Sequence, residues 1–203
     1  AYRNWQQPPP CYVLMVGDAS CDYRDYLATG KRNHAPVHLS ITSEYGLTAD
    51  DNWYVCVQGD DLLPEMLIGR IPGADSQSVG AMVDKIVSYE QNRDSGLNKA
   101  LFVADNDELV YENINKSLAK ELPDNITANN VFLSNYGDAS LARQNIIANI
   151  NAGSYITNYV GHGSINMWAS EKILRAEDIR SLTNVGKLTF VNALTCSNGY
   201  FAM

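Results

Sequence analysis

The feature of this chain that most constrains its fold is a regular alternation of short apolar runs with amphipathic segments in its second half. Strand-length runs stand at residues 100–104, 131–133, 155–160 and 188–194, and segments with helical spacing lie at 108–121, 140–151 and 176–183. Strands that alternate with helices are joined by right-handed crossovers into a parallel sheet. We therefore predict an α/β fold in which a mostly parallel sheet carries helices on both faces.

The first half of the chain is less regular. The apolar run at residues 11–16 is typical of a strand buried on both faces, and shorter strands are expected at 37–41, 53–57 and 66–68. Apolar residues recur at helical spacing between 75 and 91, with Asp75 placed as an N-cap. The polar stretch at 19–52 is expected to form long loops around its one short strand.

Length and composition favour one domain. With 203 residues and 45% hydrophobic content, the chain can bury a substantial core, and we expect a single domain over residues 1–203. Residues 1–10 end in three prolines and are predicted to be a Pro-rich lead-in. No apolar stretch approaches the roughly 20 residues of a membrane-spanning helix, so no membrane span is predicted.

The charge balance argues against nucleic acid as a partner. Fifteen Lys and Arg face 23 Asp and Glu, which gives a net charge of −8, and the sequence contains no block rich in Lys and Arg. Proteins that bind nucleic acid through the phosphate backbone need such clusters of positive charge. We therefore expect no nucleic-acid partner.

Four cysteines are present, and none of their spacings is that of a zinc or redox motif. Cys11 and Cys56 lie within apolar runs, so each is expected to be a small core residue. His34 and His38 are four residues apart, but no cysteine or carboxylate spacing supports a metal pair there. No metal ligands are therefore predicted from these residues.

Two motifs follow apolar runs near the end of the chain and place reactive side chains at strand ends. They are residues 159–164 (YVGHGS) and 194–199 (LTCSNG), which present His162 and Cys196. A thiol with an unperturbed pKa is only a few per cent ionised at pH 7, and a neighbouring imidazolium raises the fraction of thiolate. Histidine can also protonate a leaving amine. Taken singly, a turn histidine and an inert strand-end cysteine are the alternative interpretations.

Further groups gather at the same predicted edge. Asp18 and Asp105 also end apolar runs, and ligands of open parallel sheets bind beyond the carboxyl ends of the strands. The glycines beside His162 let backbone approach a substrate, so the amides of Gly163 and Cys196 are candidate oxyanion donors. Asp105 is placed where a carboxylate could fix the imidazole tautomer. Its alternative is a turn or helix N-terminal aspartate.

Five segments together resemble the gingipain family of cysteine peptidases, which belongs to the caspase-like clan. They are residues 12–19 (YVLMVGDA), 64–72 (PEMLIGRIP), 83–90 (VDKIVSYE), 158–164 (NYVGHGS) with Trp168, and 194–201 (LTCSNGYF). The resemblance extends from about residue 11 to residue 201. It implies a caspase- or gingipain-like fold and a domain that is incomplete at both ends.

The resemblance also implies residue roles. Cys196 is similar to the family's nucleophile and His162 to its general acid/base, with Gly163 and Cys196 as oxyanion donors and Asp105 as the acid that orients the histidine. Glu108 and Trp168 are the implied substrate-binding residues, although Glu108 could equally be a first-turn helix residue.

No cofactor is expected to be required. A structural calcium ion is compatible with the family and with the acidic pairs at residues 50–51 and 60–61, for which solvated surface charge is the alternative.

Three functions remain open at this point. The first is a secreted or cell-surface endopeptidase that cleaves protein or peptide substrates through a thioester on Cys196. The second is a sortase-like transpeptidase of a secretion system, in which an amine resolves the thioester. The third is a non-catalytic assembly module that retains the fold. Further domains or a processed partner chain are expected partners.

Overall fold

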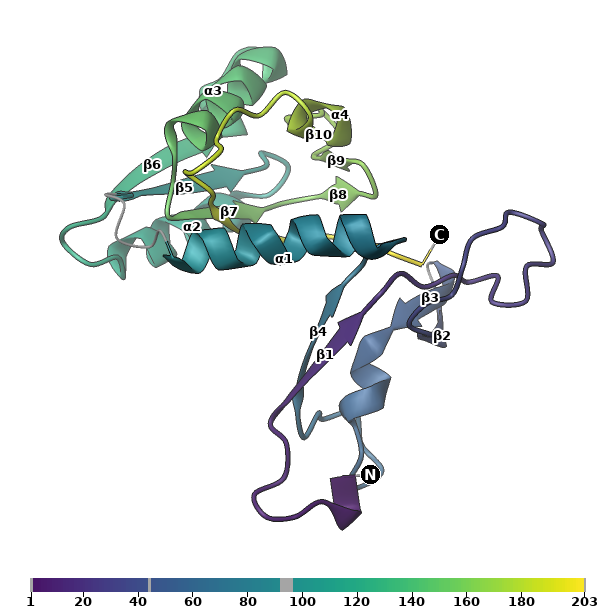
Figure 1. The fold of residues 1–203 in the computed structure, drawn as a ribbon. Coiled ribbons are helices and arrows are strands. Elements are labelled where there is room, and N and C mark those ends of the chain that lie inside the picture. Colours follow the sequence, from purple (N-terminus) through teal and green to yellow (C-terminus); the bar gives the residue numbers. More distant parts are fainter. Residues whose placement is uncertain (1, 44, 92–96, 203) are drawn as a thin grey trace. The chain divides into compact units, whose positions relative to one another are not determined.

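The computed structural model describes residues 2–43, 45–91 and 97–202. The backbone divides into two compact units, one formed by Ala1–Asp84 with Tyr200–Met203 and the other by Lys85–Gly199 (Figure 1). Each unit is described by itself below. The single domain expected over residues 1–203 stays a prediction.

A four-stranded parallel sheet forms the centre of the second unit. Its strand order is β11 (Phe190–Leu194), β7 (Ile156–Val160), β5 (Lys99–Ala104) and β6 (Thr127–Phe132). All three neighbouring pairs are parallel. The apolar runs in the second half of the chain therefore form the sheet expected of them.

Helices cover both faces of this sheet, which confirms the predicted α/β class (Figure 1). On one face, α3 (Ala139–Ala152) buries Ala142, Ile146 and Ile150 against Leu101 and Val103 of β5. On the other face, the partly buried Tyr111 and Ala119 of α2 (Leu109–Lys120) pack against the cluster that contains Phe102. Successive residues of β5 face opposite sides, so the strand is buried along almost its whole length.

The order of the strands reverses between β5 and β7. The chain passes from β5 through α2 to β6, then returns through α3 to pair β7 with the other edge of β5. The next strand, β11, continues in that second direction. Such a reversal opens a crevice beyond the carboxyl ends of the strands on either side of it. Polar residues that follow β5, β7 and β11 therefore share one edge.

Short elements follow β7 before the chain reaches β11. A three-stranded antiparallel sheet consists of β8 (Gly163–Ser164), β9 (Met167–Trp168) and β10 (Leu174–Arg175). The helix expected at 176–183 is shorter, since α4 comprises only Ala176–Ile179. The amides of residues 180–182 bond to carbonyls three residues earlier, so the last part of the predicted helix is a series of tighter turns. A further 3₁₀ turn, η3 (Leu133–Asn135), follows β6.

The first unit contains two small sheets and the start of a long helix. Strands β1 (Tyr12–Val16) and β4 (Leu67–Ile71) form a parallel pair, while β2 (His38–Thr42) and β3 (Gly46–Asp50) form an antiparallel one. A 3₁₀ turn, η1 (Tyr2–Asn4), precedes them. Helix α1 (Ser76–Gln91) begins after Asp75, whose carboxylate accepts from the Ser78 amide, as predicted. This bond lowers the pKa of Asp75.

Three expectations for this half are wrong. Strand β1 alternates in burial, with Tyr12 75% and Leu14 61% exposed, because the β1–β4 sheet has only two strands. Cys11, directly before it, is exposed rather than a core residue, and Cys56 is half-buried. The strand expected at 53–57 is instead the 3₁₀ turn η2 (Asp51–Val55), which starts where the Asp50 carboxylate accepts from the Trp53 amide.

Candidate active site

The backbone register places His162 and Cys196 at equivalent positions on neighbouring strands. Val160 of β7 pairs with Leu194 of β11, and each reactive residue follows two positions later. The ladder continues one step further, because the Gly161 amide donates to the Leu194 carbonyl at 3.3 Å. Adjacent strands lie about 4.8 Å apart. His162 and Cys196 therefore follow adjacent strands at the same carboxyl edge of the sheet.

Both side chains are accessible. The His162 side chain is 52% exposed, and Cys196 is an exposed free cysteine. Within residues 97–202, neither Nδ1 of His162 nor Sγ of Cys196 forms a hydrogen bond. A substrate could therefore reach both atoms without breaking an existing contact.

Asp105 is close to His162, but it contacts the backbone of the histidine. It follows β5 directly, is fully buried, and its Oδ2 accepts from the His162 amide at 3.1 Å. Its Oδ1 accepts from the Asn106 amide at 2.7 Å. Buried carboxylates need such donors. Asp105 therefore binds the backbone of the loop that carries His162. Its predicted effect on the imidazole tautomer stays a prediction.

The carbonyl of His162 is held as firmly as its amide. Tyr159 Oη donates to this carbonyl at 2.5 Å, and the Ala169 amide donates to it at 2.8 Å. The ring of Tyr159 is fully buried and stacks on Trp168, with centroids 4.3 Å apart. Burial, together with the carboxylate of Asp105, raises the pKa of Tyr159 far above its usual value, so the phenol remains a donor.

The glycines beside His162 are required by the packing of the protein itself. A Cβ on Gly161 would collide with Cβ of Asp105 and lie 2.6 Å from Oη of Tyr159. A Cβ on Gly163 would collide with Oγ1 of Thr195, the residue before the nucleophile candidate. Close backbone approach thus brings the histidine loop against both β5 and β11.

The amides of Gly163 and Cys196, the candidate oxyanion donors, are not taken up by hydrogen bonds of the neighbouring strands. Gly163 pairs with Trp168, and the bond from Ala169 to the His162 carbonyl makes this a non-hydrogen-bonded pair of the antiparallel ladder. The Gly163 amide is therefore not used by the ladder. The Cys196 amide likewise donates to no acceptor in the described part of the second unit. Ser197, next in the chain, has a φ of 54°, which few non-glycine residues adopt.

The packing around Gly163 leads to a first prediction. Gly163→Ala is expected to lower the free energy of unfolding by about 1–3 kcal/mol, because the new methyl group overlaps Thr195 Oγ1. Thr195→Ala should restore part of this loss, since the Thr195 hydroxyl is buried without a hydrogen-bond partner among the described residues. Urea denaturation of both single variants and the double variant measures the coupling.

Gly199→Ala is the matched control, because a Cβ there would meet no atom within 4 Å. Additive effects at Gly163 and Thr195 would contradict the predicted contact.

Two residues that the sequence did not connect with His162 lie next to its imidazole, and a third contacts one of them. Tyr111 Oη lies 3.3 Å from His162 Nε2, and Asp107 Oδ2 lies 3.9 Å from the same nitrogen. Oε1 of Glu108 lies 3.4 Å from Tyr111 Oη, and the expected role of Glu108 in binding substrate stays a prediction. The three-residue spacing of Glu108 and Tyr111 was the one feature of the sequence that could have indicated their contact, because it places both residues on one helix face.

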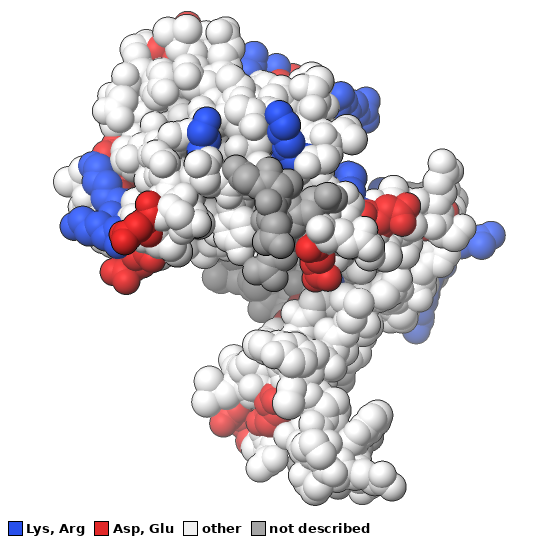
Figure 2. Space-filling model, turned by 60° about the vertical axis from the view of Figure 1, so that its left-hand side comes forward, with Lys and Arg blue, Asp and Glu red and all other residues white. Residues whose placement is uncertain are grey.

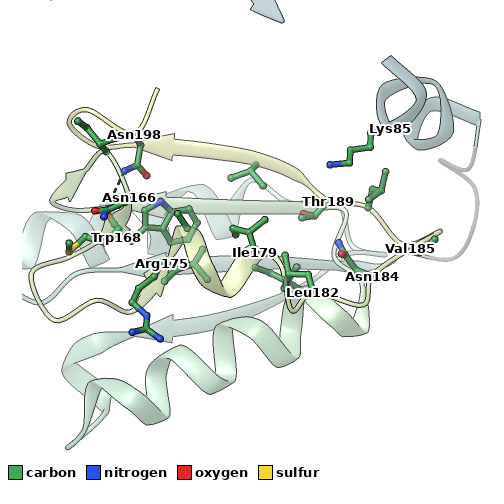
Figure 3. A pocket seen from close by; sticks show the side chains of 17 residues that line it. Lys85, Asn166, Trp168, Arg175, Ile179, Leu182, Asn184, Val185, Thr189 and Asn198 are labelled. Carbon is green, nitrogen blue, oxygen red and sulfur yellow. Dashed lines mark hydrogen bonds between the residues drawn. The ribbon is translucent and has the colours of Figure 1, made fainter. Parts of the chain in front are cut away.

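Trp168 is 7% exposed and lines an apolar cavity of about 470 Å³ in the second unit. Figure 3 shows Trp168 and Asn198 toward one end of the cavity and Asn184 and Val185 toward the other. Asn198, two residues after Cys196, donates to the carbonyls of Ser164 and Met167. Neither His162 nor Cys196 belongs to the lining. The cavity thus adjoins the loop after β11 through Asn198, without containing the His162 and Cys196 side chains.

One of the two acidic pairs considered for calcium, at residues 50–51, has partners within the protein. Both carboxylate oxygens of Asp51 accept from Arg70, at 2.6 and 2.7 Å, and Asp50 accepts from Ser40 and Trp53. Among residues 2–43, 45–91 and 97–202, no group of three or more His, Cys, Asp or Glu is placed to hold a metal ion. Asp18, the remaining strand-end candidate, belongs to the first unit.

The distribution of surface charge and the hydropathy of the helices are relevant to nucleic-acid and membrane partners. Figure 2 shows Lys and Arg as well as Asp and Glu scattered over the visible face, without a continuous patch of either sign. In the part of the chain that the structure describes, no helix is both long and apolar enough to cross a bilayer.

Comparisons with known proteins identify the family and the fold of this chain. A family model described as peptidase family C25 matches residues 1–203. Gingipain R2 of Porphyromonas gingivalis (strain ATCC BAA-308 / W83) is 28% identical over 201 residues, which cover 94% of this chain and 24% of that protein. Gingipain R1 of the same species is also 28% identical, with 18% of its length covered. The chain thus spans about a quarter or less of these curated relatives.

Two solved structures have the same fold. The crystal structure of the Arg-specific cysteine proteinase gingipain R (RgpB) has a TM-score of 0.70 at 24% identity, covering 93% of this chain and 41% of that one. A complex of the Porphyromonas gingivalis RgpB pro- and mature domains gives a TM-score of 0.71 at 24% identity, covering 94% and 42%. The predicted gingipain-like fold is thereby confirmed.

Proposed function

The chain belongs to peptidase family C25, and on that basis we propose that it supplies the catalytic machinery of a cysteine endopeptidase. The observation that carries the proposal is the shared register of His162 and Cys196, each two residues beyond the paired Val160 and Leu194. A thiol and an imidazole presented side by side, both exposed, match what thioester chemistry needs.

The proposed reaction transfers an acyl group twice. The Cys196 proton moves to the imidazole of His162, and the thiolate attacks the scissile carbonyl to form a C–S bond. The carbonyl oxygen becomes an oxyanion, for which the amides of Gly163 and Cys196 are the proposed donors. His162 then gives its proton to the amine as the C–N bond breaks. Water attacks the thioester with His162 as base, which releases the acid and restores the thiol.

The charges near His162 favour one class of substrate. Asp107 is 46% exposed beside the imidazole, and Glu108 is exposed next to it, so the local field favours a basic side chain before the cleaved bond. The similar RgpB is described as Arg-specific. We propose the same preference for this chain, together with a secreted or cell-surface location and a pro-segment or further domain as partner. Trp168 remains the proposed aromatic contact for substrate, and a structural calcium ion remains an open expectation.

The test is a panel of peptide substrates with Arg, Lys or a neutral residue before the cleaved bond. We expect cleavage after Arg or Lys and, by intact-mass spectrometry, a transient acyl adduct on the chain that Cys196→Ala lacks. Equal rates for neutral peptides would remove the basic preference alone. A folded chain that neither cleaves nor acylates would favour an assembly module. An added amine that becomes joined to the acyl fragment would instead indicate a transpeptidase.

A further inference from the structure

The two ring nitrogens of His162 have different surroundings. Nε2 lies 3.3 Å from Oη of Tyr111, and the two rings meet edge to face with their centroids 5.6 Å apart at an interplanar angle of 89°. Nδ1 has no hydrogen-bond partner among the described residues. One nitrogen is therefore engaged by the protein while the other is free for chemistry.

The hydroxyl of Tyr111 has a second partner that determines its direction. Oε1 of Glu108 lies 3.4 Å from Tyr111 Oη, and the Tyr111 amide donates to the Glu108 carbonyl at 3.1 Å. A phenol has one proton to donate, whereas an ionised carboxylate can only accept. Both contacts are satisfied when the Tyr111 proton points to Glu108 and the Tyr111 oxygen accepts from Nε2–H of His162. Burial and the carboxylate of Glu108 raise the pKa of Tyr111, so the phenol keeps this proton.

Buried asparagines fix the helix turn that carries Tyr111. Asn115, which is fully buried, donates through Nδ2 to the carbonyls of Tyr111 at 3.2 Å and Val103 at 2.9 Å. Asn158 on β7 donates to Oδ1 of Asn115 at 2.7 Å, and Asn192 on β11 donates to Oδ1 of Asn158 at 2.6 Å. These bonds link the backbone of Tyr111 to β5, β7 and β11, the strands that precede Asp105, His162 and Cys196.

We propose that Glu108 and Tyr111 are positioning residues that hold His162 with its proton on Nε2, so that Nδ1 exchanges the proton with the Cys196 thiol. The inference rests on the proposed peptidase function and assigns the atom through which it proceeds. The S–H bond of Cys196 breaks as the N–H bond at Nδ1 forms, and the same proton later leaves with the amine. Asp107, at 3.9 Å from Nε2, lies beyond hydrogen-bond reach and adds only attraction for the imidazolium.

The tautomer can be measured without substrate, by NMR of the full chain with ¹⁵N-labelled histidine at a pH where the imidazole is neutral. The chain has three histidines, and the signals of His162 are those lost in His162→Ala. We expect a single Nε2–H tautomer whose proton exchanges slowly with water. In Tyr111→Phe this proton should exchange rapidly, and kcat should fall roughly tenfold with little change in KM, the loss expected for one hydrogen bond.

Glu108→Ala makes a sharper test, because the side chain is exposed and its removal leaves the fold intact. Without the carboxylate, Tyr111 is free to donate to Nε2, so the proton of His162 should shift toward Nδ1. Asp107→Ala and Tyr136→Phe are matched controls and should leave the tautomer unchanged. In the described residues, no side-chain hydrogen bond involves the Tyr136 hydroxyl.

A parent chain with the Nδ1–H tautomer, or a tautomer and exchange rate unaffected by both Tyr111→Phe and Glu108→Ala, would overturn the inference. Because these spectra need no turnover, they separate failure of this assignment from failure of the peptidase proposal.

Discussion

His162→Ala is expected to lower kcat/KM for peptide cleavage by on the order of 10⁴-fold, the upper range for a general acid/base. The same variant should slow iodoacetamide alkylation of Cys196, because the thiol would lose the proposed acceptor of its proton. The effect follows from the register that puts both residues two positions beyond a paired Val160 and Leu194. Stopped-time hydrolysis assays and mass-spectrometric alkylation rates measure the two losses independently.

Folding is not expected to contribute to this loss. The His162 side chain is 52% exposed, so its truncation should change the free energy of unfolding by less than about 0.5 kcal/mol. His34→Ala is the matched control and should keep full activity and the parent alkylation rate. If Cys196 is alkylated as fast in His162→Ala as in the native parent, and both cleave peptides equally well, His162 does not accept the thiol proton and the mechanism proposed above is wrong.

Asp105→Ala should damage both stability and activity. The carboxylate is fully buried and accepts from the amides of His162 and Asn106, so its removal leaves two partly buried donors without an acceptor. At about 1–3 kcal/mol for each unsatisfied group, the free energy of unfolding should fall by roughly 2–6 kcal/mol. Displacement of the histidine loop should also lower kcat/KM by about 10²-fold. Thermal unfolding and steady-state kinetics measure the two effects.

Asp138→Ala provides the comparison, since Asp138 also accepts from a backbone amide, at the N-terminus of α3 in the same unit. Loss of that cap should cost only about 1 kcal/mol and leave kcat/KM unchanged. Asp105→Asn should fall between the two, because one amide keeps its acceptor while the other faces an NH₂ group. A fully active, fully stable Asp105→Ala variant would show that the loop is held by its other contacts, from Tyr159 and Ala169.

Several elements could be predicted because their causes are local. The helix Ser76–Gln91 has an N-cap aspartate and apolar residues at helical spacing, and both lie within the segment itself. The strands of the parallel sheet are apolar runs bounded by turn residues. The position of His162 and Cys196 after such runs was readable for the same reason.

Other features were not predicted because contacts outside the apolar or polar pattern decide them. The aromatic and β-branched residues at 53–57 have strand propensity, yet the Asp50 carboxylate captures the Trp53 amide and a 3₁₀ turn forms. Cys11 begins an apolar run, as a core residue often does. The run forms a strand of a two-stranded sheet, however, and Cys11 is exposed. Tyr111 carries no motif, and its contact with His162 depends on α2 lying against β5 and β7.

The sequence by itself determined the α/β class and which residues stand at the carboxyl ends of strands, because periodicity and chain punctuation are properties of neighbouring residues. Only the tertiary structure decided how those ends align. Pairing of Val160 with Leu194 and of Ala104 with Val160 sets the relative positions of His162, Cys196 and Asp105. Register arises from hydrogen bonds between strands far apart in the chain, so spacing along the sequence could not show that Asp105 holds the histidine's amide while Tyr111 faces its ring.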